Sequence, residues 1–153
     1  MMFLPFYVKE SKYALSVNQV LEVIPRVELR QLPHAPNYVS GVFNFRGSIV
    51  PVIDLCSLLQ ESPCTPYFGT RIILIRYQVD GISHILGLMA ERVTGILRVT
   101  GDALKQSGVQ IADAPYLGEI ITEQQEMIQI IQPERLLPDA VKKMLFIEPM
   151  ERL

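Results

Sequence analysis

The chain has 153 residues, of which 49% are hydrophobic and 20% are charged. This length and composition suit one ordinary domain or two small subdomains with a real apolar core, and they exclude a disordered chain. The formal net charge of −2 argues against nucleic-acid binding, which normally needs a marked excess of Lys and Arg.

The first part of the chain predicts two strands followed by a short helix. Residues 3–8 and 13–17 are apolar and strand-prone, with a polar turn between them. Ser16 and Gln19 then form a capping-box pattern. The apolar residues that follow helical spacing before Pro25 are Val17, Val20, Leu21 and Ile24. Glu22 would lie on the exposed face of this helix.

The stretch from Gly41 to Leu55 predicts a hairpin. Its tight turn falls at Arg46 and Gly47, because glycine reaches positive φ at little cost. Pro51 interrupts the second strand, and we expect it at an edge, a bulge or a bend, since proline cannot donate a ladder hydrogen bond. Asp54 is expected to cap the helical turn that follows, or to form a turn hydrogen bond.

The second half of the chain predicts similar elements. Asp80-Gly81 is a strong hairpin signal between two apolar runs. Residues 62–69, rich in proline and glycine, are the best candidate for a linker. The predicted elements are strands at 71–77 and 82–89, a short helix at 90–97, a loop at 99–113, a hairpin of 117–121 with 127–131, a turn at 133–137 and a helix at 139–146.

The two halves also match each other at an offset of about 75 residues. The repeat predicts two similar small β units that share a core and leave a groove between them, each marginal alone. The matching apolar pairs are Leu15 and Leu88, Val20 and Val93, Val23 and Ile96, Ile24 and Leu97, Val50 and Ile128, Ile53 and Ile131, Leu58 and Leu136, and Leu59 and Leu137.

The tips of the two equivalent hairpins differ in character. The first, Asn44-Phe45-Arg46-Gly47, places one cation among apolar residues, whereas the second, residues 122–126, is polar and acidic. Arg and aromatic residues dominate the binding energy of protein interfaces, which favours the first tip as an interaction surface. Solvation of an ordinary turn is the other interpretation of Arg46.

The sequence offers little for catalysis. His34 and His84 lie far apart in the chain, no glycine-rich phosphate loop is present, and no Cys/His cluster has zinc-like spacing. We therefore expect no enzyme activity, no metal and no cofactor. Cys56 is expected to be a buried small hydrophobe and Cys64 a loop residue, in a reducing compartment. Neither a signal peptide nor an apolar run of membrane-spanning length is apparent.

From Phe3 to Leu137 the chain resembles the CheW-like family of bacterial chemotaxis coupling proteins. The family usually carries Asp where this chain has Glu91. The motifs that carry the resemblance are Val20-Leu21-Glu22-Val23-Ile24, Leu32-Pro33-His34-Ala35-Pro36, the run from Gly41 to Leu55 and Gly87-Leu88-Met89-Ala90-Glu91-Arg92-Val93.

The resemblance implies a mostly β fold with two SH3-like five-stranded β-barrel subdomains and short helices. We expect a single CheW-like domain over residues 1–153. Its first subdomain would span about 14–66 plus part of the termini, its second about 67–138, and its tail 139–153.

The implied function is a non-enzymatic cytoplasmic adaptor. It would join a CheA-type histidine kinase to the cytoplasmic tip of methyl-accepting chemoreceptors, at membrane-associated arrays and without inserting into the membrane. The predicted receptor and kinase interface consists of Val20, Glu22, Asn44, Arg46, Gly47 and Ile49. Structural roles remain open for these residues, above all a core role for Val20. A small-molecule-binding regulatory β-barrel module is the alternative function.

Overall fold

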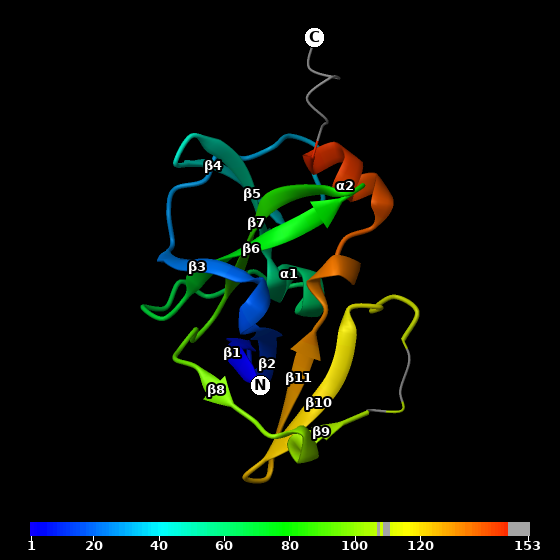
Figure 1. Cartoon of the computed structure of the whole chain (residues 1–153). Coiled ribbons are helices and arrows are strands. Elements are labelled where there is room, and N and C mark those ends of the chain that lie inside the picture. Colours follow the sequence, from blue (N-terminus) through cyan, green and yellow to red (C-terminus); the bar gives the residue numbers. More distant parts are fainter. Residues whose placement is uncertain (107, 109–110, 147–153) are drawn as a thin grey trace.

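The computed structural model describes residues 1–106, 108 and 111–146, and its strands form two sheets, one above the other in Figure 1. Sheet A has the order β8-β1-β2-β11-β10-β9, and sheet B has the order β3-β6-β7-β5-β4. The mostly β architecture of two sheet units is therefore confirmed.

The strands and helices have the following bounds. Sheet A contains β1 (Met2–Val8), β2 (Ser11–Ser16), β8 (Leu97–Arg98), β9 (Leu104–Lys105), β10 (Leu117–Glu123) and β11 (Glu126–Ile131). Sheet B contains β3 (Val20–Pro25), β4 (Val39–Phe45), β5 (Ser48–Asp54), β6 (Arg71–Val79) and β7 (Ile82–Ala90). The helices are α1 (Leu55–Gln60) and α2 (Asp139–Leu145), with 3-10 turns η1 (Val17–Gln19), η2 (Gly101–Ala103) and η3 (Pro133–Arg135).

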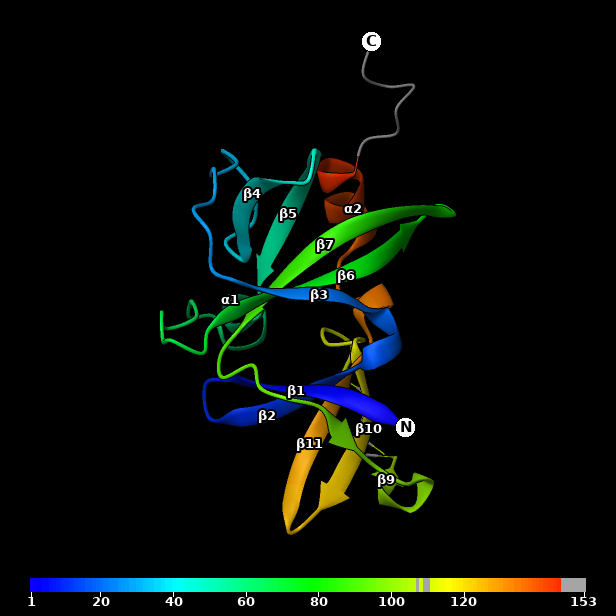
Figure 2. The ribbon, with the colours of Figure 1, turned by 60° about the vertical axis from the view of Figure 1, so that its left-hand side comes forward.

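The two halves of the chain exchange their first hairpins. The β1–β2 hairpin pairs with strands of the second half, and the β6–β7 hairpin pairs with strands of the first half (Figure 2). Read from β8 and from β3, the first five strands of sheet A and the five strands of sheet B have equivalent orders, and β9 is an additional edge strand of sheet A. In both sheets a parallel pair, β2 with β11 or β7 with β5, joins the halves. Because of this exchange, sheet B takes its strands from residues 20–54 and 71–90, and sheet A takes its strands from residues 2–16 and 97–131.

Buried side chains form three clusters, and most of the repeat pairs hold equivalent places in them, although Ile96 is exposed while its partner Val23 is packed against the largest cluster. The largest, here called the central layer, joins residues from both sheets, while two smaller clusters belong to sheet A and sheet B alone. Leu15 and its repeat partner Leu88 both lie in the central layer. Val50 lies in the cluster of sheet B, and its partner Ile128 lies in the cluster of sheet A.

Strand β6 shows how one element serves two clusters. Ile72 and Leu74 belong to the cluster of sheet B, while Ile73 and Ile75 belong to the central layer. Successive side chains of a strand point to opposite faces, so both faces of β6 are covered. This explains why residues 72–75 of β6 are a continuous apolar run rather than an alternating one.

The helix predicted over residues 17–24 is wrong. Only η1 is helical, and the chain continues as strand β3, which has a register shift between Val20 and Glu22. Such a bulge inserts one residue and reverses the alternation of side chains. As a result Val20 and Val23 both pack against the central layer, which reproduces the three-residue spacing of a helix. Ser16 makes no side-chain cap.

The helix predicted over residues 90–97 is also wrong. After β7, Glu91 forms an isolated bridge with Tyr7, and the chain then crosses to sheet A as β8. Val93 packs in the central layer, while Leu97 packs against the cluster of sheet A. The apolar spacing therefore reflects a chain that passes from one cluster to another.

The remaining elements follow the predictions more closely. Helix α1 is confirmed, and Asp54 caps it by accepting a hydrogen bond from the Ser57 amide at 3.1 Å. The hairpins at Asp80-Gly81 and at β10–β11 are confirmed. Helix α2 is confirmed, but its cap is Pro138 rather than Asp139. Residues 147–153 of the predicted tail lie outside the described residues.

Pro51 occupies a position that its chemistry allows. Strand β5 pairs with β4 along most of its length, including Val42 with Pro51. Its registered partners in β7 begin only at Val52. Pro51 therefore lies where β5 has a neighbour on one side, as expected for a residue that cannot donate a ladder hydrogen bond.

The Glu91 carboxylate ties the two sheets together. Its side chain is 2% exposed, and it accepts hydrogen bonds from the amides of Lys9, at 3.2 Å, and Thr65, at 2.6 Å. The Lys9 ammonium lies 3.5 Å from the same carboxylate. Lys9 belongs to the β1–β2 turn of sheet A, so glutamate at this position joins both sheets to the loop after α1.

We predict that Glu91→Ala lowers the free energy of unfolding by about 2–4 kcal/mol, because it leaves two amides without their acceptor and removes the counter-charge of the Lys9 ammonium. Denaturant unfolding measures the change. Glu126→Ala is the matched control, since its ion pair with Lys12 is exposed and should contribute less than about 1 kcal/mol. Equal losses in the two variants would contradict the role assigned to Glu91.

Burial of Tyr77 leads us to expect that the free energy of unfolding depends on pH. Its side chain is buried in the central layer, with its ring 5.8 Å from that of Phe146, and burial raises its pKa to about 12. The unfolded chain ionises near its ordinary pKa of about 10, so this group stabilises the fold below pH 10 and loses that effect as pH rises through 12. We expect wild type to lose about 2 kcal/mol more than Tyr77→Phe between pH 10 and pH 12 in denaturant titrations. Parallel losses in the two proteins would show that Tyr77 ionises normally.

Candidate protein-binding surface

The tip of the β4–β5 hairpin has the tight turn that the sequence predicts. Phe45 pairs with Ser48, and the two residues between them, Arg46 and Gly47, have φ values of 50° and 92°. Positive φ at both central residues is typical of a type I′ turn. The Asn44 side-chain oxygen accepts a hydrogen bond from the Gly47 amide at 2.9 Å. Asn44 therefore holds the turn that presents Arg46.

The Arg46 side chain remains accessible while it is held in place. Its guanidinium lies 3.1 Å from the Glu22 carboxylate and 4.6 Å from the centre of the Phe45 ring. The side chain is 72% exposed. Glu22 comes from β3 and Arg46 from the β4–β5 turn, so this ion pair connects the two ends of sheet B. The sequence could not reveal this pair, because Glu22 is 24 residues away and was expected on a helix.

Ile49 adds exposed apolar surface to the same tip. It is 65% exposed and pairs across the hairpin with Asn44. Gly47 and Ile49 also line a cavity of about 430 Å³, whose other walls include His84 and Phe146. The tip therefore combines an exposed cation, an exposed aliphatic side chain and an adjacent hollow.

Val20 differs from the other predicted site residues. It is half-buried, pairs with Ile75 and packs against the central layer. The structure brings Glu22 together with Arg46, and Asn44 with Gly47 and Ile49, whereas the contacts of Val20 are those of a core residue. Participation of all six residues in an interface stays a prediction.

Two sheets that share one core, with an exposed hairpin tip at one of them, are the architecture of a scaffold domain. The chain belongs to the CheW-like domain family, whose model matches residues 2–141. Membership in this family makes the protein a non-enzymatic adaptor of chemotaxis signalling. The predicted fold with two SH3-like subdomains is confirmed.

Similar proteins cover most of the chain. A probable chemotaxis protein CheW of Rhizobium etli is 27% identical over 136 residues, which are 88% of this chain and 85% of that protein. Protein FrzA of Myxococcus xanthus is 29% identical over 90% of this chain and 86% of its own. The crystal structure of scaffolding protein TtCheW from Thermoanaerobacter tengcongensis has a TM-score of 0.81 and 27% identity, covering 94% of this chain and 92% of that one.

Within the part of the chain that the structure describes, no helix has both the length and the apolarity needed to cross a membrane.

We predict that the Glu22–Arg46 pair contributes less than about 1 kcal/mol to stability, because exposed ion pairs gain little over solvation. A double-mutant cycle of Glu22→Ala, Arg46→Ala and the double variant measures the coupling by denaturant unfolding. The small coupling should shrink further at 1 M salt, where charges are screened. A coupling above about 2 kcal/mol would show that Arg46 stabilises the fold and is not available to contact a partner.

Proposed function

We propose that this adaptor joins the cytoplasmic tip of a methyl-accepting chemoreceptor to a CheA-type histidine kinase. The observation that carries the proposal is the exposed hairpin tip, where Arg46 is held by Glu22 yet remains accessible. Membership in the CheW-like family and the chemotaxis proteins among its relatives support the same assignment. In this role the protein acts in the cytoplasm, at membrane-associated receptor arrays.

The proposed interface consists of Val20, Glu22, Asn44, Arg46, Gly47 and Ile49. Arg46 offers donors to acidic or carbonyl groups of a partner, and Ile49 offers apolar area beside it. The contacts of Asn44 with the Gly47 amide and of Glu22 with Arg46 fix the shape of this surface before binding. A preformed surface reduces the entropy lost on association.

The adaptor role needs only binding and rigidity. Two partners held on one body raise each other's effective concentration. A receptor whose states contact this body differently can then change the kinase through it, since differential affinity for two states shifts the equilibrium between them. The small-molecule module is the second candidate, and the cavity of about 430 Å³ beside the hairpin lies in the size range of ligand sites.

Direct binding tests the proposal. We expect purified protein to bind the regulatory domain of a CheA-type kinase and a receptor tip fragment at micromolar concentrations, measured by isothermal titration calorimetry. Failure to bind either partner at tens of micromolar would contradict the proposal, and a small metabolite that shifts the Tm in their absence would favour the second candidate.

Arg46→Glu tests the surface itself. It places two acids side by side at the hairpin tip, and we expect at least about a tenfold higher Kd for one partner, or about 1.4 kcal/mol. The Tm should change by less than about 3 °C, because the lost ion pair is exposed. Arg98→Glu is the matched control, since Arg98 is an exposed cation on β8 of sheet A. Equal weakening in both variants would indicate a general charge effect and contradict the assigned surface.

A further inference from the structure

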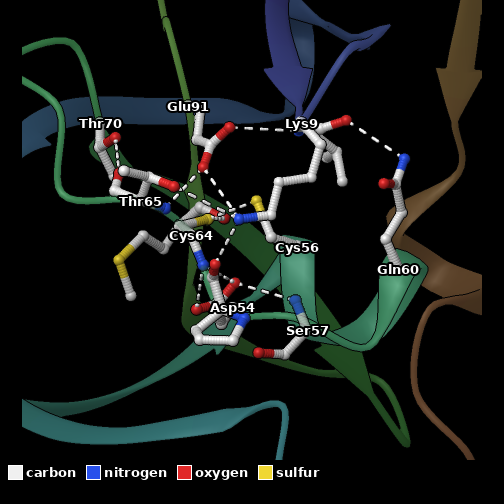
Figure 3. Close-up of polar contacts among 12 residues, drawn as sticks. Lys9, Asp54, Cys56, Ser57, Gln60, Cys64, Thr65, Thr70 and Glu91 are labelled. Atoms are coloured by element: carbon white, nitrogen blue, oxygen red, sulfur yellow. Dashed lines mark hydrogen bonds and ion pairs between the residues drawn. The ribbon is translucent and has the colours of Figure 1, made fainter.

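Two cysteine side chains meet beneath the loop that follows α1. Cys56 lies in the first turn of α1 and is buried, and Cys64 lies in the loop between α1 and β6 and is half-buried. Their sulfur atoms are 2.7 Å apart, and both are free thiols (Figure 3). The sequence indicated a buried hydrophobe and a loop residue, without suggesting that they meet.

Hydrogen bonds of the Cys64 and Thr65 backbone keep the two thiols close together. The Asp54 carboxylate accepts a bond from the Cys64 amide at 3.0 Å while it caps α1 through Ser57. The next residue, Thr65, donates its amide to the buried Glu91 carboxylate, and its carbonyl accepts from the Thr70 hydroxyl at 2.6 Å. Figure 3 shows these groups around the two sulfurs. The close approach of the thiols thus belongs to a loop fixed at several points.

We propose that Cys56 and Cys64 are a reversible modification site, at which a low-molecular-weight disulfide oxidises the pair to an intramolecular disulfide. This goes beyond the adaptor function. Disulfides in a reducing compartment are usually transient and redox-sensing, and a pair that closes within one chain suits such reversibility.

The reaction proceeds by two thiol–disulfide exchanges. The Cys64 thiolate, the more accessible of the two, attacks one sulfur of oxidised glutathione, breaks its sulfur–sulfur bond and releases one glutathione thiolate. The Cys56 thiolate then attacks the Cys64 sulfur of the mixed disulfide and displaces the second glutathione. Two electrons pass to glutathione, and the two cysteine protons leave with the released thiolates.

The surroundings of Cys64 disfavour its thiolate. The hydrogen bond with Cys56, burial and the neighbouring Asp54 carboxylate, in that order, raise the pKa of the Cys64 thiol. Strongly oxidising dithiols owe their potential to a stabilised thiolate, and these groups act in the opposite direction. The disulfide carries no charge and avoids the repulsion from Asp54. The low thiolate fraction also makes oxidation slow at neutral pH.

A metal site is the competing use of the same groups. One oxygen of Asp54 and the sulfurs of Cys56 and Cys64 lie within 4.8 Å of one another. Both oxygens of Asp54 already accept backbone amides, however, from Ser57 and Cys64. Coordination would have to weaken the cap of α1 and the anchor of the loop, whereas a sulfur–sulfur bond leaves these bonds in place.

The test oxidises the full chain with excess oxidised glutathione at pH 8 and then alkylates the remaining thiols. We expect an intact mass 2 Da below that of the reduced chain, with no alkyl group and with Cys56 linked to Cys64 in the peptide map. The cross-link shortens a loop of the unfolded chain, so the Tm should rise by about 5 °C and return after reduction with dithiothreitol.

Cys64→Ser is the matched control, and Cys56→Ala is the second variant should the first alter the fold. Neither variant should change its Tm between oxidising and reducing conditions, while circular dichroism reports that each is folded. Two alkylated thiols after oxidation, a stable glutathione adduct on Cys64 or disulfide-linked dimers would overturn the proposal. Stoichiometric binding of Zn²⁺ that needs both thiols would overturn it in favour of a metal site.

Discussion

The structure depends on burial of the central layer, the apolar cluster that joins the two sheets. The first hairpin of each half of the chain belongs to the sheet formed with strands of the other half. In each sheet a parallel strand pair joins this hairpin to the other half. Neither sheet can keep its strands if the halves separate. The central layer also receives Ile73, from one face of β6, and Leu136, the residue that follows η3. The proposed role, in which two partners are held in fixed geometry, needs this coupling, since independent subdomains would move relative to each other.

Polar groups at the edge of the central layer complete the connection. Asp54 and Glu91 are both buried, and each accepts backbone amides from the loop after α1. Asp54 belongs to β5, and Glu91 follows β7 and bonds the turn of sheet A through Lys9. The two cysteines lie between these carboxylates in Figure 3. Oxidation of the two thiols would therefore change the loop after α1, which Asp54 and Glu91 connect to both sheets. This loop is separate from the tip of the β4–β5 hairpin.

Local features of the sequence predicted local features of the structure well. The turn at Gly47, the cap at Asp54 and the repeat were correct because each depends on residues near in sequence or on matching apolar positions. The helix over residues 17–24 failed because a bulge reverses the alternation of a strand and reproduces helical spacing. The exchange of hairpins and the Glu22–Arg46 and Cys56–Cys64 contacts were beyond reach, since strand order and long-range partners leave no local pattern.

The central claim is that both sheets form one cooperative body, and native-state hydrogen exchange tests it most directly. The amides of the two parallel pairs, β2 with β11 and β5 with β7, belong to different sheets. If the exchanged hairpins bind the halves together, the most protected amides of both sheets should exchange only through global unfolding, with one common free energy. Amides of one sheet that exchange at a free energy lower by about 2 kcal/mol or more would show that this sheet opens alone and would contradict the account.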